Sequence, residues 1–178
     1  MIGQVIWITG LSGAGKTTLA KELILHLQKS SSKPILLDGD ILRNILRNDD
    51  MGDDGHSREV RIKLALKYAQ MCKLLSSQGL TVVIATISMF EEVYVWNKKN
   101  LPNYFEVYLK VPVEELRRRD PKLIYQRYDS GDLLNVAGLD LAVDEPYNPN
   151  LFLDFENQPA FWKSPKSLVR RLISELEK

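Results

Sequence analysis

The 178-residue sequence has a single cysteine, no long apolar run and almost no net charge. With only Cys72, no intrachain disulfide can form, and such cysteine usage is typical of a reducing compartment. No stretch approaches the ~20 consecutive apolar residues that a membrane-spanning helix needs. Residues Met1–Gln4 lack the basic region that opens a signal peptide, and the apolar run behind them is too short for one. We therefore expect a cytoplasmic protein without a membrane partner.

The formal net charge is +1, with lysine and arginine spread along the chain. This balance argues against a nucleic acid as the main partner. With 44% apolar and 26% charged residues, the composition is that of an ordinary globular protein. The length suits one domain with a proper hydrophobic core, so we expect a single domain over residues 1–178.

What the sequence does contain is a glycine-rich loop between an apolar run and a helical pattern. Residues 10–17 read Gly-Leu-Ser-Gly-Ala-Gly-Lys-Thr, the phosphate-binding loop pattern G-x-x-x-x-G-K-[ST]. Glycine lets the backbone approach a ligand closely, so that successive N–H groups and the free N-terminus of the next helix face a polyphosphate. Lys16 can then reach the β- and γ-phosphates, and the Thr17 hydroxyl can ligate Mg²⁺. A chance match is the alternative, which the strand and helix on either side disfavour. The predicted ATP-binding residues are Gly10, Ser12, Gly13, Ala14, Gly15, Lys16, Thr17 and Thr18.

Apolar runs and helical patterns alternate along the rest of the chain. This alternation predicts an α/β fold in which helices cover both faces of a parallel sheet. From Asp120 to Pro149 the pattern breaks down, and the polar composition predicts an irregular lid or binding loop. The five expected strands are Val5–Thr9, Ile35–Leu37, Thr81–Ala85, Phe105–Val111 and Leu151–Phe155.

Ligands of such sheets bind at the carboxyl ends of the strands. Asp38-Gly39-Asp40 follows the second expected strand and Ile87-Ser88 follows the third. Of two carboxylates beside a phosphate loop, one can hold Mg²⁺ through water and one can accept or orient an acceptor hydroxyl proton. Asp40 also stands where a helix N-cap should, so capping is its alternative role.

Taken in order, these motifs resemble the adenylylsulfate (APS) kinases. The resemblance covers about Val5 to Asn150. It implies a P-loop kinase fold with strand order 2-3-1-4-5 that uses MgATP to phosphorylate the 3′-hydroxyl of a bound nucleotide. Because kinases of this family are often dimers, it also favours a homodimer. The matching residues are Ile6–Thr18, Leu37–Asp40 with Arg43, Ile87-Ser88, Arg119–Lys122, Tyr125 and Asn135–Asp140.

The resemblance assigns roles on the acceptor side. Asp40 matches the family's acceptor-side carboxylate, and Asp38 matches its partner near the metal. Arg43 and Arg61 match arginines that bind the anionic part of the acceptor nucleotide.

Further contacts follow from the same resemblance. Ile87 and Ser88 match the acceptor-contacting edge, where a hydroxyl can position the substrate without a covalent intermediate. Asn135 and Val136 fall in the matching acceptor segment. Arg119 matches the arginine that packs on the ATP adenine, a role that suits a planar guanidinium.

The departures from the family pattern gather on the acceptor side. His56 and Val136 stand where the family holds the acceptor's adenine between two phenylalanines. Leu134 replaces a lysine, and Leu64 and Leu66 replace an asparagine and an arginine. Losing both rings removes stacking of ~1–3 kcal/mol per base, although His56 can still stack. A related kinase acts on cytidine diphosphoramidate, and this smaller base is our alternative acceptor to adenylyl sulfate.

Two other classes remain open. A non-catalytic ATP-binding switch would need no acceptor site, which the combination of Asp38, Asp40, Arg43 and Ser88 disfavours. Kinases of sugar acids lack the spacing from Asp38 to Arg43 and the match over Asn135–Asp140.

Overall fold

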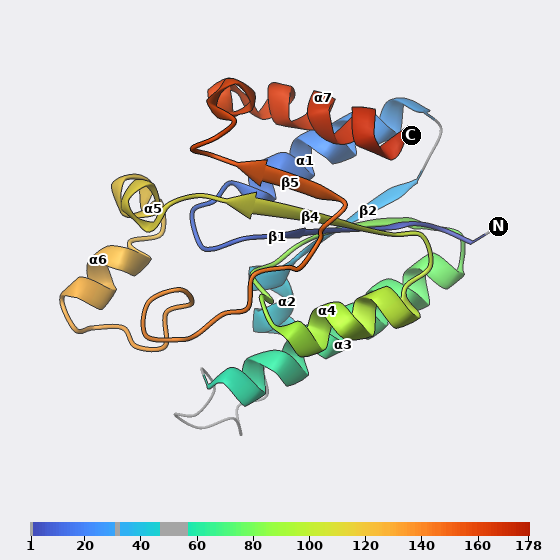
Figure 1. Ribbon diagram of the computed structural model, residues 1–178. Helices are drawn as coiled ribbons and strands as arrows, with labels where there is room; N and C mark the ends of the chain where they lie inside the picture. Colours follow the sequence, from blue (N-terminus) through green and yellow to red (C-terminus); the bar gives the residue numbers. More distant parts are fainter. Residues whose placement is uncertain (1, 31–32, 47–56) are drawn as a thin grey trace.

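The computed structural model describes residues 2–30, 33–46 and 57–178. Its centre is a five-stranded sheet in the order β2-β3-β1-β4-β5, in which all neighbouring strands run parallel (Figure 1). This topology confirms the predicted fold class and strand order. The strands are β1 (Val5–Thr9), β2 (Pro34–Asp38), β3 (Thr81–Ala85), β4 (Tyr104–Lys110) and β5 (Leu151–Asp154).

Helices cover both faces of the sheet. Figure 1 shows α1 (Lys16–Leu27) and α7 (Pro165–Leu176) on one face, and α3 (Arg58–Ser77) and α4 (Glu91–Asn100) on the other. The shorter elements are α2 (Gly39–Leu46), α5 (Val113–Arg119), α6 (Ile124–Asp129) and the 3-10 turns Gln28–Ser30 and Pro159–Lys163.

The central strand β1 is buried on both faces. Successive side chains of a strand point to opposite faces. Ile6 and Ile8 therefore pack in the cluster beneath α1 and α7, whereas Val5 and Trp7 pack in the cluster beneath α3 and α4. Burial on both faces explains why this strand is an unbroken apolar run.

Helix α3 begins and ends as its sequence predicts. The Ser57 hydroxyl accepts a hydrogen bond from Val60 N (3.4 Å), and Gly79 follows the helix with a φ of 86°. Cys72 lies in its middle, fully buried, where burial raises the pKa of the thiol to about 12. It is a structural thiol with little nucleophilic character.

The expectation of an irregular segment after Asp120 is wrong over Ile124–Asp129, which form α6. The Asp120 carboxylate accepts hydrogen bonds from Ile124 N (2.8 Å) and Gln126 N (2.9 Å) at the start of this helix. Tyr125 is buried, and its hydroxyl donates to Ser12 O in the phosphate loop (3.0 Å). One and a half turns are too short to leave a helical period in the sequence.

None of the helices within the described ranges is long and apolar enough to cross a lipid bilayer.

We predict that Leu23→Ala destabilises the protein by about 2–5 kcal/mol, because it leaves a cavity beneath α1 where Leu23 is fully buried. Leu25→Ala is the matched control on the same helix: its side chain is 56% exposed, and the change should stay within about 0.5 kcal/mol. Urea unfolding of both variants measures the difference. Equal losses would contradict the placement of α1 on the sheet.

Candidate active site

The carboxyl-end edge of the sheet carries a cavity of about 420 Å³. Its walls come from the phosphate loop, the ends of β2 and β3, the start of α3, and two stretches around α6, residues 121–127 and 133–137. The strands are parallel, so segments that are far apart in the sequence meet at this edge.

The phosphate loop forms one end of the cavity. Gly15, the N-cap of α1, has a φ of 97°, and a Cβ on Gly10 would lie 2.5 Å from Leu109 O. Both positions therefore require glycine. Gly10 and Ala14 lie behind the cavity wall, and the loop residues that line it are Ser12, Gly13, Gly15, Lys16, Thr17 and Thr18.

Lys16 is held within its own loop, where its ammonium donates to Leu11 O (2.7 Å). Burial, followed by the positive charge of Lys122, lowers the pKa of Lys16 to about 7, although Asp40 and Asp38 act in the opposite direction. Phosphate oxygens in the cavity would favour the charged ammonium and raise this pKa.

The Asp38 carboxylate joins the phosphate loop to α2. Its Oδ2 accepts from the Thr17 hydroxyl (2.8 Å), and its Oδ1 accepts from Asp40 N (2.9 Å) and Ile41 N (3.4 Å). Asp38 therefore supplies the cap of α2, and the alternative capping role for Asp40 is wrong.

Thr17 and Asp38 also fit a magnesium ion. They are hard oxygen ligands beside the phosphate loop, and the described residues contain no group of three His, Cys, Asp or Glu that would form a cage for a metal. Mg²⁺ is typically held by one or two protein oxygens together with phosphates and water.

Asp40 lies within the first turn of α2, and its carboxylate contacts the Lys122 ammonium. Burial acts to raise the pKa of Asp40, but the hydrogen bond and charge of Lys122, followed by Arg43 and Lys16, outweigh it and lower the pKa. Asp40 is thus an anion at neutral pH. It is better suited to orient a hydroxyl than to remove its proton as a strong base.

Arg43 and Arg61 line the same cavity as the phosphate loop. Arg61 donates to Asn135 O (2.7 Å). Burial and then the charge of Arg43 lower the pKa of Arg61 to about 10, and Asp140 opposes them. Two neighbouring guanidiniums that line one cavity can form a site for an anionic group.

Three of the six remaining predicted residues also reach the cavity. Ile87, Asn135 and Val136 line it. Ser88 does not: it is buried, and its hydroxyl lies 2.7 Å from Thr86 Oγ1. His56 lies outside the described residues.

Arg119 lies outside the cavity. Its guanidinium stands 4.9 Å from the centre of the Phe155 ring and 5.7 Å from that of Trp162, and its Nε donates to Glu115 (2.7 Å). On either side of Arg119 in the chain, Leu116 and Pro121 lie against Gly13 of the phosphate loop.

The departures on the acceptor side separate into two groups. Leu134, 67% exposed, and Val136, 5% exposed, line the cavity. Leu64 and Leu66 instead pack in the core with Trp7, so their apolar character is explained by packing rather than by the acceptor.

Sequence reasoning missed two cations and one hydroxyl that line the cavity, Lys122, Arg127 and Thr86. Lys122 precedes α6 and Arg127 lies within it, in the segment that was expected to cover the site. Their positive charge in that segment was the available signal. Thr86 carried no signal beyond its place after β3.

Comparisons with known proteins agree with this geometry. The profile of the adenylylsulphate kinase family matches residues 2–154. The chain is 42% identical over 142 residues to a cytidine diphosphoramidate kinase of Campylobacter jejuni, covering 80% of this chain and 81% of that one. It is 36% identical over 176 residues to an adenylyl-sulfate kinase of Pseudomonas aeruginosa, covering 97% and 85%.

Among solved structures, the APS kinase of Mycobacterium tuberculosis in complex with AMPPNP and APS superposes with a TM-score of 0.86. The two chains are 29% identical, and the match covers 99% of each. The profile and both relatives span most of this chain, and its cavity brings a phosphate loop together with two carboxylates. The chain belongs to the adenylylsulphate kinase family and is a P-loop phosphotransferase.

Proposed function

We propose that this kinase transfers the γ-phosphate of ATP to the 3′-hydroxyl of a nucleotide acceptor. The observation that carries the proposal is the lining of one cavity: it holds the phosphate loop, Arg43 and Arg61, and also Asp40, on which the charges of both Lys16 and Arg43 act. This arrangement provides two anion sites and a hydroxyl-orienting carboxylate, which is what phosphoryl transfer between two nucleotides requires.

On the ATP side, the loop N–H groups hold the phosphates, and Lys16 leaves Leu11 O to reach the β- and γ-oxygens. Thr17 and Asp38 would hold Mg²⁺, which would neutralise charge on the phosphates when bound. The family resemblance assigns Arg119 to the ATP adenine, and packing on a flat ring suits a planar guanidinium.

On the acceptor side, Asp40 orients the attacking hydroxyl, and Arg43 and Arg61 bind the anionic group of the acceptor. Lys122 contacts Asp40 directly, so we add it to the predicted site as a cation near the transferring phosphate. Asn135, Val136 and Ile87 form the wall for the base and ribose. Ser88 acts behind this wall, through its hydrogen bond to Thr86.

Two acceptors have support. Adenylyl sulfate is the substrate that the family name and the relative from Pseudomonas aeruginosa suggest. Cytidine diphosphoramidate is suggested by the relative from Campylobacter jejuni and by the aliphatic side chains of Leu134 and Val136 where the family pattern has a lysine and a phenylalanine. A wall without aromatic rings gives an adenine less stacking.

Residues 120–149 would act as a lid within a single domain. Lys122, Arg127 and Asn135 bring this segment to the cavity from three points. A homodimer stays a prediction of the family resemblance.

Lys16→Ala should abolish transfer, a loss of more than about 100-fold, because no other group reaches the β- and γ-phosphates in the transition state. Lys21→Ala, an exposed lysine of the same helix, is the control and should leave kcat unchanged. Coupled measurement of ADP release compares them. Retained turnover in Lys16→Ala would remove the loop lysine from the mechanism.

Asp40→Asn should keep ATP binding and lose most of kcat, by about 100-fold or more, because only the acceptor hydroxyl loses its orienting carboxylate. Calorimetry with ATP and steady-state kinetics with the acceptor give the two readings. An unchanged kcat would show that Asp40 has no part in the transfer.

Cytidine diphosphoramidate should give a higher kcat/KM than adenylyl sulfate, because Val136 offers an adenine no aromatic face. Side-by-side assays with MgATP and each nucleotide decide between them. A clear preference for adenylyl sulfate would show that other groups replace the missing rings. If neither nucleotide, nor a uridine diphosphate derivative, stimulates ADP release, the ATP-binding switch becomes the better hypothesis.

A further inference from the structure

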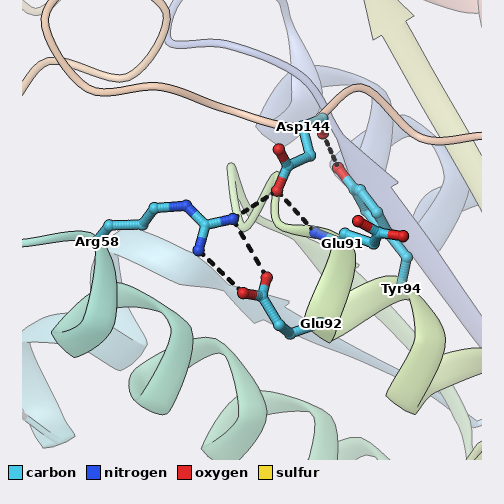
Figure 2. Close-up of polar contacts among 5 residues, drawn as sticks. All are labelled: Arg58, Glu91, Glu92, Tyr94 and Asp144. Atoms are coloured by element: carbon cyan, nitrogen blue, oxygen red, sulfur yellow. Dashed lines mark hydrogen bonds and ion pairs between the residues drawn. The ribbon is translucent and has the colours of Figure 1, made fainter.

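Charged groups from three segments meet at the start of α4 (Figure 2). Arg58, the first residue of α3, donates from Nη1 and Nη2 to the two carboxylate oxygens of Glu92 (2.9 and 3.3 Å). Its Nη2 also donates to Asp144 Oδ2 (2.7 Å). We call Arg58, Glu92 and Asp144 the clamp.

Asp144 holds the start of α4 as well as Arg58. The N-cap residue of α4 is Phe90, which has no side-chain acceptor. Asp144 Oδ2 accepts from Glu91 N (3.0 Å), so a carboxylate 53 residues further along the chain provides the cap. Its backbone is fixed too, because Asp144 N donates to Met89 O (2.9 Å) and the Tyr94 hydroxyl donates to Asp144 O (3.1 Å), as Figure 2 shows for Tyr94.

The clamp lies outside the cavity but holds a segment that lines it. Asn135, Val136 and Ala137 form part of the cavity wall. They belong to a closed turn, in which the Asp140 carboxylate accepts from Asn135 N (2.7 Å) and Val136 N (2.6 Å). This turn leads within four residues to Asp144.

The first turn of α3 therefore contacts the segment at two points. Arg61 donates to Asn135 O at the cavity, and Arg58 binds Asp144 at the far end. A restraint at both ends fixes where the Asn135 and Val136 backbone lies relative to the acceptor arginines.

We propose that Arg58 is a positioning residue for the acceptor subsite, acting through Asp144 on the wall formed by residues 135–137. The identity of that subsite rests on the proposed function; the clamp itself rests on the contacts above.

The charges in this cluster are partly exposed, and an exposed ion pair contributes little to stability. The geometry is better defined than in a single pair, because the Arg58 guanidinium binds two carboxylates and stands 5.3 Å from the centre of the Phe90 ring. Loss of the clamp should therefore appear in acceptor binding more than in the melting temperature.

Arg58→Ala should raise the KM for the acceptor about fivefold, with kcat and the KM for ATP unchanged. Arg58→Lys should recover part of the loss, because an ammonium can still bind Asp144. Arg171→Ala is the matched control: the Arg171 side chain is 35% exposed against 33% for Arg58, pairs with Glu175, and stands 5.9 Å from the Phe161 ring. Adenylyl sulfate and cytidine diphosphoramidate are the acceptors assayed.

Hydrogen exchange without nucleotide tests the clamp independently of the reaction. The amides of Glu91, Asn135, Val136 and Asp144 should exchange faster in Arg58→Ala than in wild type or Arg171→Ala. Unchanged exchange, or equal increases in the KM for ATP and for acceptor, would overturn the positioning role. Faster exchange in a protein whose wild type phosphorylates neither acceptor would support the clamp and contradict the proposed function.

Discussion

The hydrogen bond from the Thr17 hydroxyl to Asp38 is the contact that joins the two halves of the cavity. Thr17 belongs to α1, the helix after the phosphate loop, and Asp38 ends β2, the strand that leads to Asp40 and Arg43. The same carboxylate caps α2 and thereby fixes the direction in which Asp40 and Arg43 leave that helix. β3 separates β1 from β2 in the sheet, so the Thr17–Asp38 contact spans the end of a strand. The parallel sheet makes this possible because all three strands end at the same edge.

Without bound nucleotides, the charges gathered around this contact lower the stability of the folded protein. Lys16, Lys122, Arg43, Arg61 and Arg127 line one cavity, and the carboxylates among its described lining residues are Asp38 and Asp40. The lowered pKa values of Lys16 and Arg61 show that burial and neighbouring cations disfavour these charges. Polyphosphate and an anionic acceptor would supply the missing negative charge. The protein should therefore be more stable with its substrates bound.

The parts of the structure that sequence predicts well are those in which local residues decide the conformation. The phosphate loop, the buried strand Val5–Thr9 and the start of α3 at Ser57 each follow from neighbouring residues. Other features depend on contacts that are distant in the sequence. The Asp38 carboxylate is held beside the phosphate loop by the Thr17 hydroxyl, 21 residues away. α6 forms because Asp120 caps it and Tyr125 reaches the phosphate loop 113 residues away.

The same distinction explains why the acceptor side was harder to assign. Compared with the family pattern, Leu64 and Leu66 look like substituted acceptor contacts. The structure instead places both in the hydrophobic cluster that contains Trp7. Arg58 and Asp144 are 86 residues apart, and neither belongs to a motif that sequence reasoning identified.

In the proposed function, one continuous stretch, residues 10–18, binds the ATP phosphates, whereas the proposed acceptor wall is assembled from α2, α3, the end of β3 and residues 133–137. Substitutions in any of these separate segments can change which acceptor binds without changing a residue of the phosphate loop. This division is consistent with relatives of similar identity to this chain whose names specify adenylyl sulfate in one case and cytidine diphosphoramidate in the other. In the proposed function, acceptor choice would depend on how these distant segments are held together, and the clamp at the start of α4 is one place where this chain holds two of them.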